Sequence, residues 1–319
     1  MNDPRNTPGA IMVEYSIVIP VFKSSECLYE LYERLTTVFR DISSNYEIIL
    51  VDDASPDDSW KIMQQIKSKD HHVKIIQHMR NFGQHKATLC GLHYSKGDFV
   101  ITMDDDLQHP PEEIPKLIEA IRNNDEIDAV FAAYGVKQHS WFRNLGTNAI
   151  NAITSYIFTK NKGLKLTSFR IMRRPIVNEL ENTHYHNPRI CQLLLRITHR
   201  ITNVQVAHHP RKIGRSGYSF HRLISDALDN ILSNSSLPLQ VVSYIGFGSS
   251  LLSVVLSLYY LYMYFLIGIS VPGWTTIILL LLFFFGILFF SLGIVGEYLI
   301  RILREVQGSP KSIIRKKEL

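Results

Sequence analysis

Three consecutive aspartates, Asp104, Asp105 and Asp106, follow the apolar run "VITM" and precede Gln108. Carboxylate oxygens suit hard cations such as Mg²⁺ or Mn²⁺, which also hold phosphate oxygens. Neighbouring side chains on an extended backbone point to opposite faces, so we expect Asp104 and Asp106 to converge while Asp105 points away. The spacing therefore predicts a divalent-cation site, with a solvated acidic loop as the alternative.

A second acidic pair, Asp52 and Asp53, ends the apolar run "EIILV". A carboxylate at the end of a strand can accept hydrogen bonds from a ribose or from the edge of a base. The alternative is that one of the two, Asp53 in particular, caps the following turn "ASPDDS".

The elements that must position these acids alternate between short apolar runs and amphipathic stretches. The continuous Val/Ile content of the runs predicts strands buried on both faces of a parallel sheet. The expected strands are 15–21, 46–53, 72–78, 98–105, 127–134 and, later in the chain, 203–212. The expected helices are 26–40, 57–70, 85–95, 111–123, 140–158 and 221–232.

Repeated β-α-β units predict an open sheet whose ligand lies beyond the carboxyl ends of the strands. Both acidic clusters fall at that edge. No G-x-G-x-x-G follows the first strand and the chain has no G-x-x-x-x-G-K-[ST], so dinucleotide oxidoreductases and P-loop enzymes lose their main support.

The segment 230–296 contains no Asp, Glu, Lys, Arg or His. Its two apolar stretches, 242–267 and 274–295, are each long enough to cross a bilayer core of about 30 Å. They predict a transmembrane hairpin, with a buried helical pair in a soluble core as the alternative. The Lys/Arg-rich tail after the second stretch predicts that the large N-terminal domain and both termini are cytoplasmic.

The formal net charge of +5 fits anionic partners such as phosphates or a lipid surface. We expect no nucleic-acid partner. The basic end "IIRKKEL" is interpreted as an anchor to anionic lipid headgroups. The three cysteines are scattered without metal-ligand or disulfide-framework spacing, which suits a reducing compartment.

Taken in order, "VIPVF", "ILVDDASPDDS", "MRNFGQHKA", "GDFVITMDDDLQHPPEEIPKL", "SFRIMRR", "GRSGYSFHRLI" and the paired apolar stretches resemble the bacterial polyprenyl-phosphate glycosyltransferases of glycosyltransferase family 2. The resemblance covers nearly the whole chain. It implies a GT-A fold, which is α/β and Rossmann-like with a mostly parallel sheet. The implied organisation is a catalytic domain at 1–218, an interfacial helix at 219–240, two transmembrane helices at 241–296 and a basic cytoplasmic tail at 297–319.

The resemblance also implies roles for particular residues. The metal would be held by Asp104, Asp106 and Gln108. The nucleotide sugar would be bound by Pro20, Phe22, Glu26, Asp52, Asp53, Arg80, Asn81, Gly83, Gln84, Asp105 and Ser216. The acceptor phosphate would be bound by Arg143 and Arg170, and the catalytic set would be Asp104, Asp106 and Arg211, with Arg211 and Ser216 on a loop that closes over the donor diphosphate.

The function implied is metal-dependent inverting transfer of a sugar from a nucleotide sugar to polyprenyl phosphate at the cytoplasmic face of the membrane, by a homo-oligomer. UDP is the preferred nucleotide, with GDP or dTDP open. One alternative is a processive polysaccharide synthase, although the Q-x-x-R-W motif of those enzymes is absent. The other is a catalytically silent membrane subunit, which has no need of Asp104, Asp106 and Gln108 together.

The chain departs from the family pattern at three places. Pro20-Val21-Phe22-Lys23-Ser24 replaces P-x-Y-N-E, Ser168 replaces the Asp of Asp-Phe-Arg, and Gly214-Arg215-Ser216-Gly217-Tyr218 replaces G-E-S-K-Y. The donor and any general base depend on these places more than the fold does. Relatives often carry a small residue at the position of Asp105, so its carboxylate is expected to be dispensable.

Overall fold

The computed structural model describes residues 13–134, 164–182, 189–207, 237–267, 273–306 and 312–319. The chain divides into two compact units. The first contains residues 1–139, 160–216 and 308–319, and the second contains residues 140–159 and 217–307. Each unit is considered by itself.

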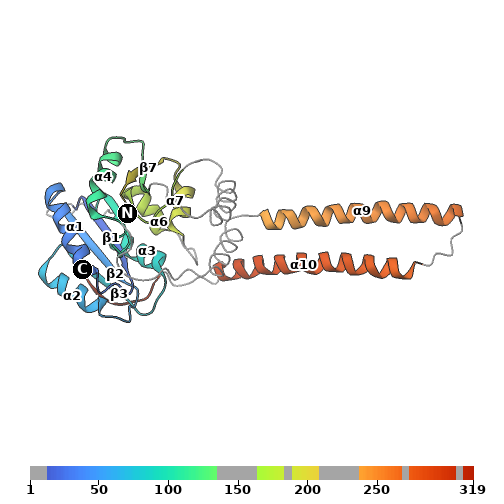
Figure 1. Cartoon of the computed structure of the whole chain (residues 1–319), viewed down its shortest axis with the longest axis horizontal. Helices are drawn as coiled ribbons and strands as arrows, with labels where there is room; N and C mark the ends of the chain where they lie inside the picture. Colours follow the sequence, from blue (N-terminus) through green and yellow to red (C-terminus); the bar gives the residue numbers. More distant parts are fainter. Residues whose placement is uncertain (1–12, 135–163, 183–188, 208–236, 268–272, 307–311) are drawn as a thin grey trace, which may run out of the picture. The chain divides into compact units, whose positions relative to one another are not determined.

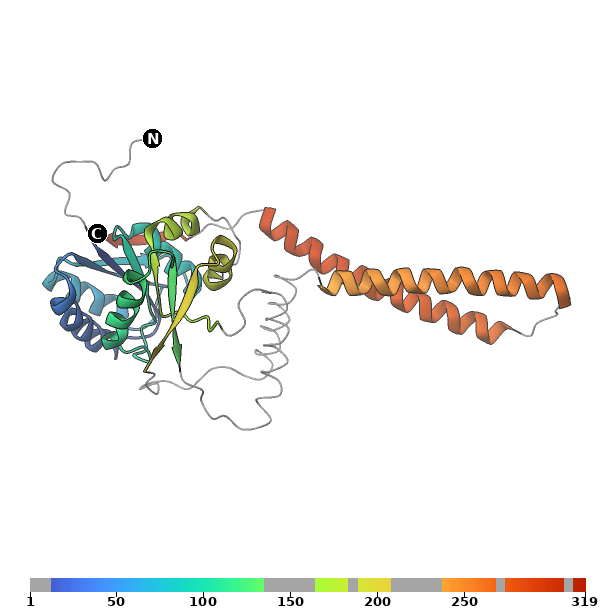
Figure 2. The same cartoon turned by 90° about the horizontal axis from the view of Figure 1, so that it is seen from above.

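A mostly parallel sheet forms the centre of the first unit (Figures 1 and 2). Its strands are β1 (Tyr15–Val21), β2 (Tyr46–Asp52), β3 (Val73–His78), β4 (Phe99–Thr102), β5 (Ala129–Tyr134), β6 (Arg170–Arg173), β7 (Ile201–Val206) and β8 (Ile314–Glu318). Their order is β7-β5-β6-β4-β1-β2-β3-β8, and β1 pairs in parallel with both β2 and β4. The sheet confirms the predicted α/β fold with a mostly parallel sheet.

Helices cover both faces of this sheet because the strands bury alternate side chains on opposite sides. Ile17 and Ile19 of β1 pack into one core, and Val18 packs into the other. The helices of the first core are α1 (Leu28–Ile42), α2 (Ser59–Lys69) and α4 (Ile114–Arg122), the last preceded by the 3-10 turn η2 (Pro111–Glu113). The helices of the second core are α3 (Gln84–Tyr94), α6 (Arg174–Glu181) and α7 (Ile190–Ile197).

Strand β4 is shorter than predicted. It ends at Thr102, so the three aspartates lie in the irregular loop that follows and not on extended backbone. Leu107 in this loop has φ of +58°, a left-handed conformation that turns the chain sharply. The alternation of side chains along a strand therefore does not set the directions of the aspartates.

The basic tail also differs from its interpretation as a lipid anchor. Residues Ile314–Glu318 form β8, which pairs antiparallel with β3 at the edge of the catalytic sheet. Residues 308–319 belong to the first unit, and the domain boundaries inferred from the sequence remain predictions. An edge strand such as β3 exposes a row of unpaired backbone groups, and β8 satisfies them.

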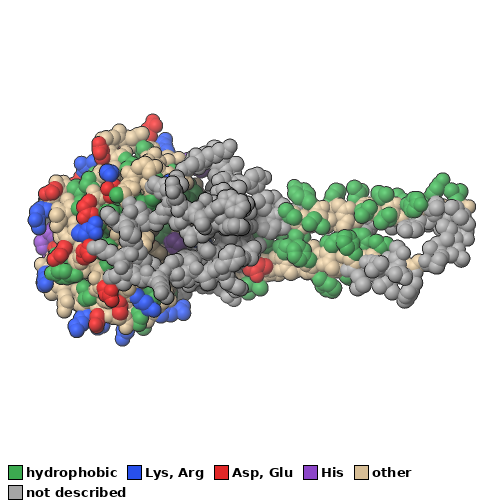
Figure 3. All heavy atoms as spheres, viewed as in Figure 1, with side chains coloured by type: hydrophobic (Ala, Val, Ile, Leu, Met, Phe, Trp, Pro, Cys, Tyr) green, Lys and Arg blue, Asp and Glu red, His purple; other side chains and the backbone are tan. Residues whose placement is uncertain are grey.

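The second unit contains two long helices, α9 (Leu237–Ile267) and α10 (Trp274–Val306), which pack side by side. Apolar side chains cover much of the visible surface of both (Figure 3). Among the described residues, one stretch, Phe283–Ile300 of α10, is long and apolar enough to cross a membrane, with a mean hydropathy of 2.0 over 18 residues. The two-span hairpin remains a prediction. The expected helices at 140–158 and 221–232 lie outside the described residues, as does the expected strand beyond residue 207.

Candidate active site

A cavity of about 240 Å³ opens at the carboxyl ends of β1, β2 and β4. This is the edge at which open parallel sheets bind their ligands. It is lined by Pro20, Val21, Phe22, Asp53, Asn81, Gln84, Asp104, Asp105 and Asp106. Eight of these nine residues belong to the predicted donor and metal sets, so residues from four separate motifs meet at one place.

Asp104 is oriented by hydrogen bonds to both of its carboxylate oxygens. The amide of Gln84, at the start of α3, donates to Oδ1. The hydroxyl of Ser168 donates to Oδ2 at 2.7 Å. His109 lies beneath, with its Nδ1 accepting the backbone N–H of Asp104 at 3.4 Å. Its ring is held between Tyr134 and Phe169, at centroid distances of 5.6 and 5.4 Å.

Asp105 anchors the loop that follows β1. Its Oδ2 accepts the backbone N–H of Phe22 at 3.0 Å and the hydroxyl of Ser24. Desolvation raises the pKa of Asp105 to about 6, with these two hydrogen bonds opposing the shift and the charges of Asp104 and Asp106 adding to it. Asp105 therefore positions the loop after β1. From the sequence we expected its carboxylate to be dispensable and did not predict this contact.

Asp106 also turns part of its carboxylate toward its own loop, where Oδ1 accepts the backbone N–H of Gln108 at 3.2 Å. The side chain of Gln108 does not line the cavity. Three neighbouring carboxylates around one cavity are a donor set of oxygens only, which suits Mg²⁺ or Mn²⁺ and would be relieved of repulsion by either. The residues therefore fit a divalent cation held by Asp104 and Asp106.

Asp52 and Asp53 lie at the end of β2, and from the sequence we named Asp53 as the one that could cap the following turn. In the structure Asp52 has that role. Asp52 is the turn residue, since its Oδ1 accepts the N–H of Ser55 at 3.0 Å and its Oδ2 accepts the Gln77 amide at 3.0 Å. Asp52 is fully buried and is not among the cavity-lining residues. Asp53 borders the cavity, although it is only 2% exposed.

Asp53 holds the next loop in place. Its carboxylate accepts the backbone N–H groups of Phe82 and Gly83 at 2.9 and 2.7 Å, and Nδ1–H of His78 at 2.8 Å. Gly83 has φ of +93°, which a side chain would strain. This geometry orients Asn81 and Gln84 into the cavity.

Arg80 is exposed, with its guanidinium 4.8 Å from the centre of the Phe82 ring. Arg80, Gly83 and the exposed Glu26 do not line the cavity, although the resemblance assigns them to the donor. Arg143, Arg211 and Ser216 lie outside the described residues.

A basic cluster lies beside Asp104. Arg170 is 2% exposed, and its guanidinium bonds to the Thr167 carbonyl and the Cys191 sulfur, while its Nε has no hydrogen-bond partner among the described residues. Within the described part of the chain, no carboxylate pairs with Arg170 or with the half-buried Arg189. His85 is exposed at the surface, and desolvation of its ring together with the charges of Arg170 and Arg189 lowers its pKa to about 4.

Five contributors to the site were not singled out as functional from the sequence: Ser24, His85, His109, Ser168 for its contact with Asp104, and Arg189. Ser168 was noted only as a departure from Asp-Phe-Arg. Its proximity to Asp104 depends on β6 pairing with β4, which short strands do not reveal in a sequence.

Comparisons with known proteins agree with this geometry. The model of the family "Glycosyl transferase family 2" matches residues 16–181. The undecaprenyl-phosphate 4-deoxy-4-formamido-L-arabinose transferase of Proteus mirabilis (strain HI4320) is 33% identical over 304 residues, covering 94% of this chain and 93% of its own. The enzyme of the same name from Salmonella choleraesuis (strain SC-B67) is 33% identical, with coverages of 97% and 94%.

A solved structure with the same fold is that of glucosyl-3-phosphoglycerate synthase from Mycobacterium tuberculosis in complex with Mn²⁺, UDP and glucosyl-3-phosphoglycerate. Its TM-score is 0.52 at 15% identity, over 73% of this chain and 84% of that one. The likeness supports the fold. The resemblance to polyprenyl-phosphate glycosyltransferases is confirmed by the sequence relatives, and the chain is a glycosyltransferase that belongs to glycosyl transferase family 2.

Proposed function

We propose that this enzyme transfers a sugar from a nucleotide diphosphate sugar, UDP in preference to GDP or dTDP, to polyprenyl phosphate, with a divalent cation and with inversion at the anomeric carbon. The observation that carries the proposal is the single cavity in which Asp104, Asp105 and Asp106 meet the ends of β1 and β2. The acceptor class is supported by the undecaprenyl-phosphate transferases that match nearly the whole chain.

The nucleoside half of the donor would lie against the loop after β1. Phe22 is 42% exposed at the cavity, so its ring offers a face on which a base can stack. Asn81 and Asp53 supply an amide and a carboxylate for the ribose or the base edge. A UDP complex of a protein with the same fold supports uridine as the first nucleotide to test.

The diphosphate half would lie at Asp104 and Asp106, which would hold Mg²⁺ or Mn²⁺. When bound, the cation would neutralise charge on the leaving diphosphate. Gln84 and Ser168 keep the carboxylate of Asp104 aimed into the cavity. Arg211 and Ser216 complete the proposed diphosphate site from the loop that the resemblance implies, and Gln108 is a further candidate ligand.

The acceptor phosphate would bind at the cluster of Arg170, Arg189 and His85. A buried guanidinium with no carboxylate partner is costly, and an anion would offset that cost. The cluster adjoins Asp104 on two sides, because Gln84 precedes His85 and Ser168 precedes Arg170 by two residues. Arg143 is the second predicted acceptor residue.

The proposed reaction is one displacement. A phosphate oxygen of the acceptor forms a bond to the anomeric carbon as the bond from that carbon to the β-phosphate oxygen breaks, and nucleoside diphosphate leaves. A phosphate monoester has a second pKa of about 6, so the nucleophile is already anionic near neutral pH. No general base is therefore needed, and Ser168 can stand where relatives carry an aspartate.

The apolar unit supports catalysis at a membrane. The acceptor phosphate lies at the bilayer surface, and α10 contains a stretch of sufficient length and hydropathy to cross the bilayer. We include in the proposal the second span in α9, the placement of the catalytic domain on the cytoplasmic side of the inner membrane, and a homo-oligomeric state. Cysteine accessibility across sealed vesicles would test the topology.

The direct test is to incubate the detergent-purified enzyme with undecaprenyl phosphate, Mn²⁺ and separate UDP-, GDP- and dTDP-sugars, and to identify the lipid product by mass. We expect one glycosyl phosphoprenol with inverted anomeric configuration, and no product in EDTA. Asp106→Ala should abolish transfer, whereas Asp41→Ala, which removes an exposed carboxylate from α1, should not.

The outcome also separates the alternatives. A ladder of products with several sugars would identify a processive synthase. Absence of both product and nucleotide binding would identify a silent membrane subunit. Full Mn²⁺-dependent transfer by Asp106→Ala would refute the assignment of the metal ligands.

A further inference from the structure

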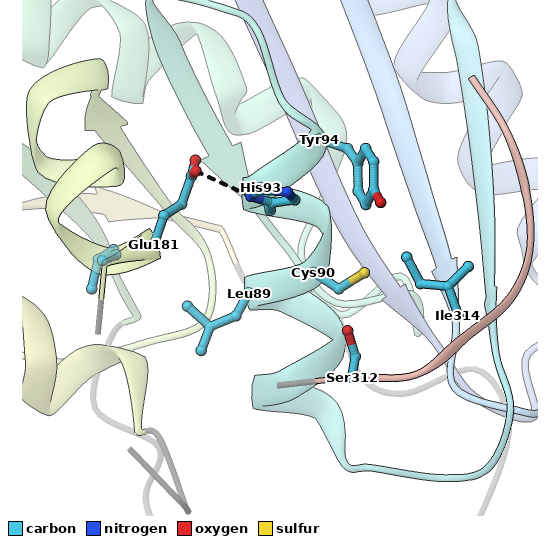
Figure 4. A pocket seen from close by; sticks show the side chains of 8 residues that line it. Leu89, Cys90, His93, Tyr94, Glu181, Ser312 and Ile314 are labelled. Atoms are coloured by element: carbon cyan, nitrogen blue, oxygen red, sulfur yellow. Dashed lines mark ion pairs between the residues drawn. The ribbon is translucent and has the colours of Figure 1, made fainter. Parts of the chain in front are cut away.

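A second cavity, of about 260 Å³, lies among α3, α6 and the segment that leads into β8 (Figure 4). It is lined by Leu89, Cys90, His93, Tyr94, Leu180, Glu181, Ser312 and Ile314. An ion pair between His93 and Glu181, at 3.4 Å, crosses one side of it. None of these residues belongs to the donor cavity, and the proposed transfer reaction uses none of them.

Cys90 is the chemically reactive group in this cavity. It is 7% exposed, and its sulfur points along the cavity toward Ile314 (Figure 4). Ile314 is also the residue of β8 that pairs with His78 of β3. The thiol therefore lies over the end of β3, on the face of the sheet that α3 covers.

His78 faces the same thiol from the sheet. It is two residues beyond Ile76, which packs with Cys90 in one core cluster, so both side chains of β3 point toward α3. His78 is fully buried, and its Nε2 has no hydrogen-bond partner among the described residues. Its other nitrogen, Nδ1, is 2.8 Å from the Asp53 carboxylate.

The charge state of His78 follows from these contacts. Burial alone lowers its pKa, but the hydrogen bond that His78 donates to Asp53 and the proximity of Cys90 outweigh burial and raise the pKa to about 9. At neutral pH the ring is an imidazolium that donates Nδ1–H to Asp53. A neighbouring imidazolium favours the thiolate form of cysteine, which is the nucleophile.

Cys27 provides an internal comparison because it is almost equally buried, at 8% exposed. Its neighbours have the opposite effect. Burial raises the pKa of Cys27 to about 11, and the charges of Asp105 and Asp106 add to the shift. The two thiols are thus buried to nearly the same extent. They differ in the neighbouring charge, which is positive at Cys90 because of His78 and negative at Cys27 because of Asp105 and Asp106.

We propose that Cys90 is a site of covalent modification by small disulfides, opened to solvent by the cavity behind α3 and activated by the His78–Asp53 pair. The Cys90 thiolate attacks one sulfur of the disulfide, a mixed disulfide forms, and the original S–S bond breaks. The other half leaves as a thiolate and takes up the proton that Cys90 has released. The disulfide is reduced as Cys90 is oxidised, so no further oxidant is required.

Modification also reaches the donor cavity. Asp53 accepts the backbone N–H groups of Phe82 and Gly83 with the same carboxylate that holds His78. A group added at Cys90 replaces the thiol hydrogen beside His78 and fills space next to its ring, which disturbs the support of the loop carrying Asn81 and Gln84. This second step, weaker nucleotide binding, rests on the proposed function.

The test treats the full-length protein in detergent at pH 7.5 with cystamine and follows the mass of each cysteine-containing peptide. We expect Cys90 to gain one cysteamine at least about tenfold faster than Cys27, because a thiol with a pKa of about 11 is almost wholly protonated at this pH. Cys90→Ser should remove this mass gain. Equal rates at Cys90 and Cys27 in the folded protein would overturn the proposal without any variant.

His78→Gln tests the activating group. This variant should slow labelling of Cys90 in the folded protein and leave it unchanged in denaturant, where only intrinsic thiol reactivity remains. Wild-type labelling of folded His78→Gln would refute the role of His78.

Calorimetry with UDP and Mn²⁺ then separates the two proposals. Labelled protein should bind UDP at least about fivefold more weakly, and dithiothreitol should restore the affinity. Unchanged binding after labelling would refute the coupling to the donor cavity. Absence of binding by unlabelled protein would refute the proposed function instead, while the labelling rates would still decide the thiol site.

Discussion

Replacement of Asp105 tests two possibilities. Either its carboxylate is dispensable, or it anchors the loop after β1 while its buried negative charge destabilises the fold. Its Oδ2 accepts hydrogen bonds from the Phe22 N–H and the Ser24 hydroxyl. Asp104 precedes it and Asp106 follows it. Asp105→Asn keeps an acceptor oxygen for both bonds and removes the charge. Asp105→Ala removes both the charge and the acceptor.

The magnitude follows from the raised pKa of about 6, compared with about 3.9 for an unfolded aspartate. Because the folded pKa is the higher one, the favourable contribution is complete below about pH 4 and is lost as pH rises through 6. Two pKa units correspond to about 3 kcal/mol, and partial exposure reduces this to about 1–2 kcal/mol. Asp105→Asn should therefore be more stable than the wild type by about that amount at pH 7.5 and nearly equal to it at pH 4.

The assay is thermal unfolding in detergent with EDTA at pH 4.5, 6 and 7.5. A gain of about 1–2 kcal/mol corresponds to an increase in Tm of roughly 2–8 °C for a unit of this size. Asp41→Asn, which removes an exposed acid, should show no pH-dependent gain. If the difference in Tm between Asp105→Asn and the wild type is the same at pH 4.5 and 7.5, the ionised carboxylate of Asp105 does not destabilise the fold and the reasoning is refuted.

Asp105→Ala should behave differently from Asp105→Asn. The loss of two hydrogen bonds to a charged group, each worth about 1.5–3 kcal/mol, exceeds the relief of charge, so the alanine variant should be less stable than the wild type by about 1–5 kcal/mol. The loop at Phe22 also loses its anchor, and we expect UDP affinity to fall about tenfold, measured by calorimetry with Mn²⁺. Equal UDP affinity for the Ala and Asn variants would show that the anchor does not matter to the donor.

Three further predictions follow from single contacts. Ser168→Ala removes the 2.7 Å hydrogen bond to Asp104 and should lower kcat about tenfold, with nucleotide affinity nearly unchanged, as steady-state kinetics would show. Gly83→Ala forces a side chain into φ of +93° and should cost about 1 kcal/mol of stability and weaken UDP binding, whereas Gly246→Ala in α9, where an added Cβ meets nothing within 4 Å, should not lower Tm. The His78–Asp53 pair should stabilise the fold most at pH values between the lowered pKa of Asp53 and the raised pKa of His78. The contribution of His78 is complete below about pH 6.5 and is lost as pH rises through about 9. The Tm of the wild type should therefore fall more steeply from pH 7 to 9.5 than the Tm of His78→Gln.

The sequence was sufficient to predict the five strands from β1 to β5 and the helices between them, because their apolar runs match the demands of a sheet buried on both faces. It also predicted which acids meet at the candidate site, since the rule that ligands bind at the carboxyl ends of parallel strands brings Asp53 and Asp104 to one cavity. The local sequence pattern does not predict elements that form only by pairing with strands far away in the sequence. The strand β6 has four residues and pairs with β4 and β5, and β8 has five residues and pairs with β3, so each forms against strands that are distant in the sequence.

The three aspartates show the same division between local pattern and distant contact. If β4 continued through Asp106, alternation would send Asp104 and Asp106 one way and Asp105 the other. The strand instead ends at Thr102, and each acid takes the direction set by its partners: Asp104 toward Gln84 and Ser168, Asp105 toward the loop after β1, and Asp106 toward its own loop.

Adjacent like charges are tolerated here because each acid also has hydrogen-bond donors from other parts of the fold, and because a divalent cation would neutralise Asp104 and Asp106 in the proposed complex. The number of acids in such a run is therefore not the number of metal ligands. Asp105 contributes by fixing Phe22 at the mouth of the cavity, so a neutral acceptor should replace it and an alanine should not.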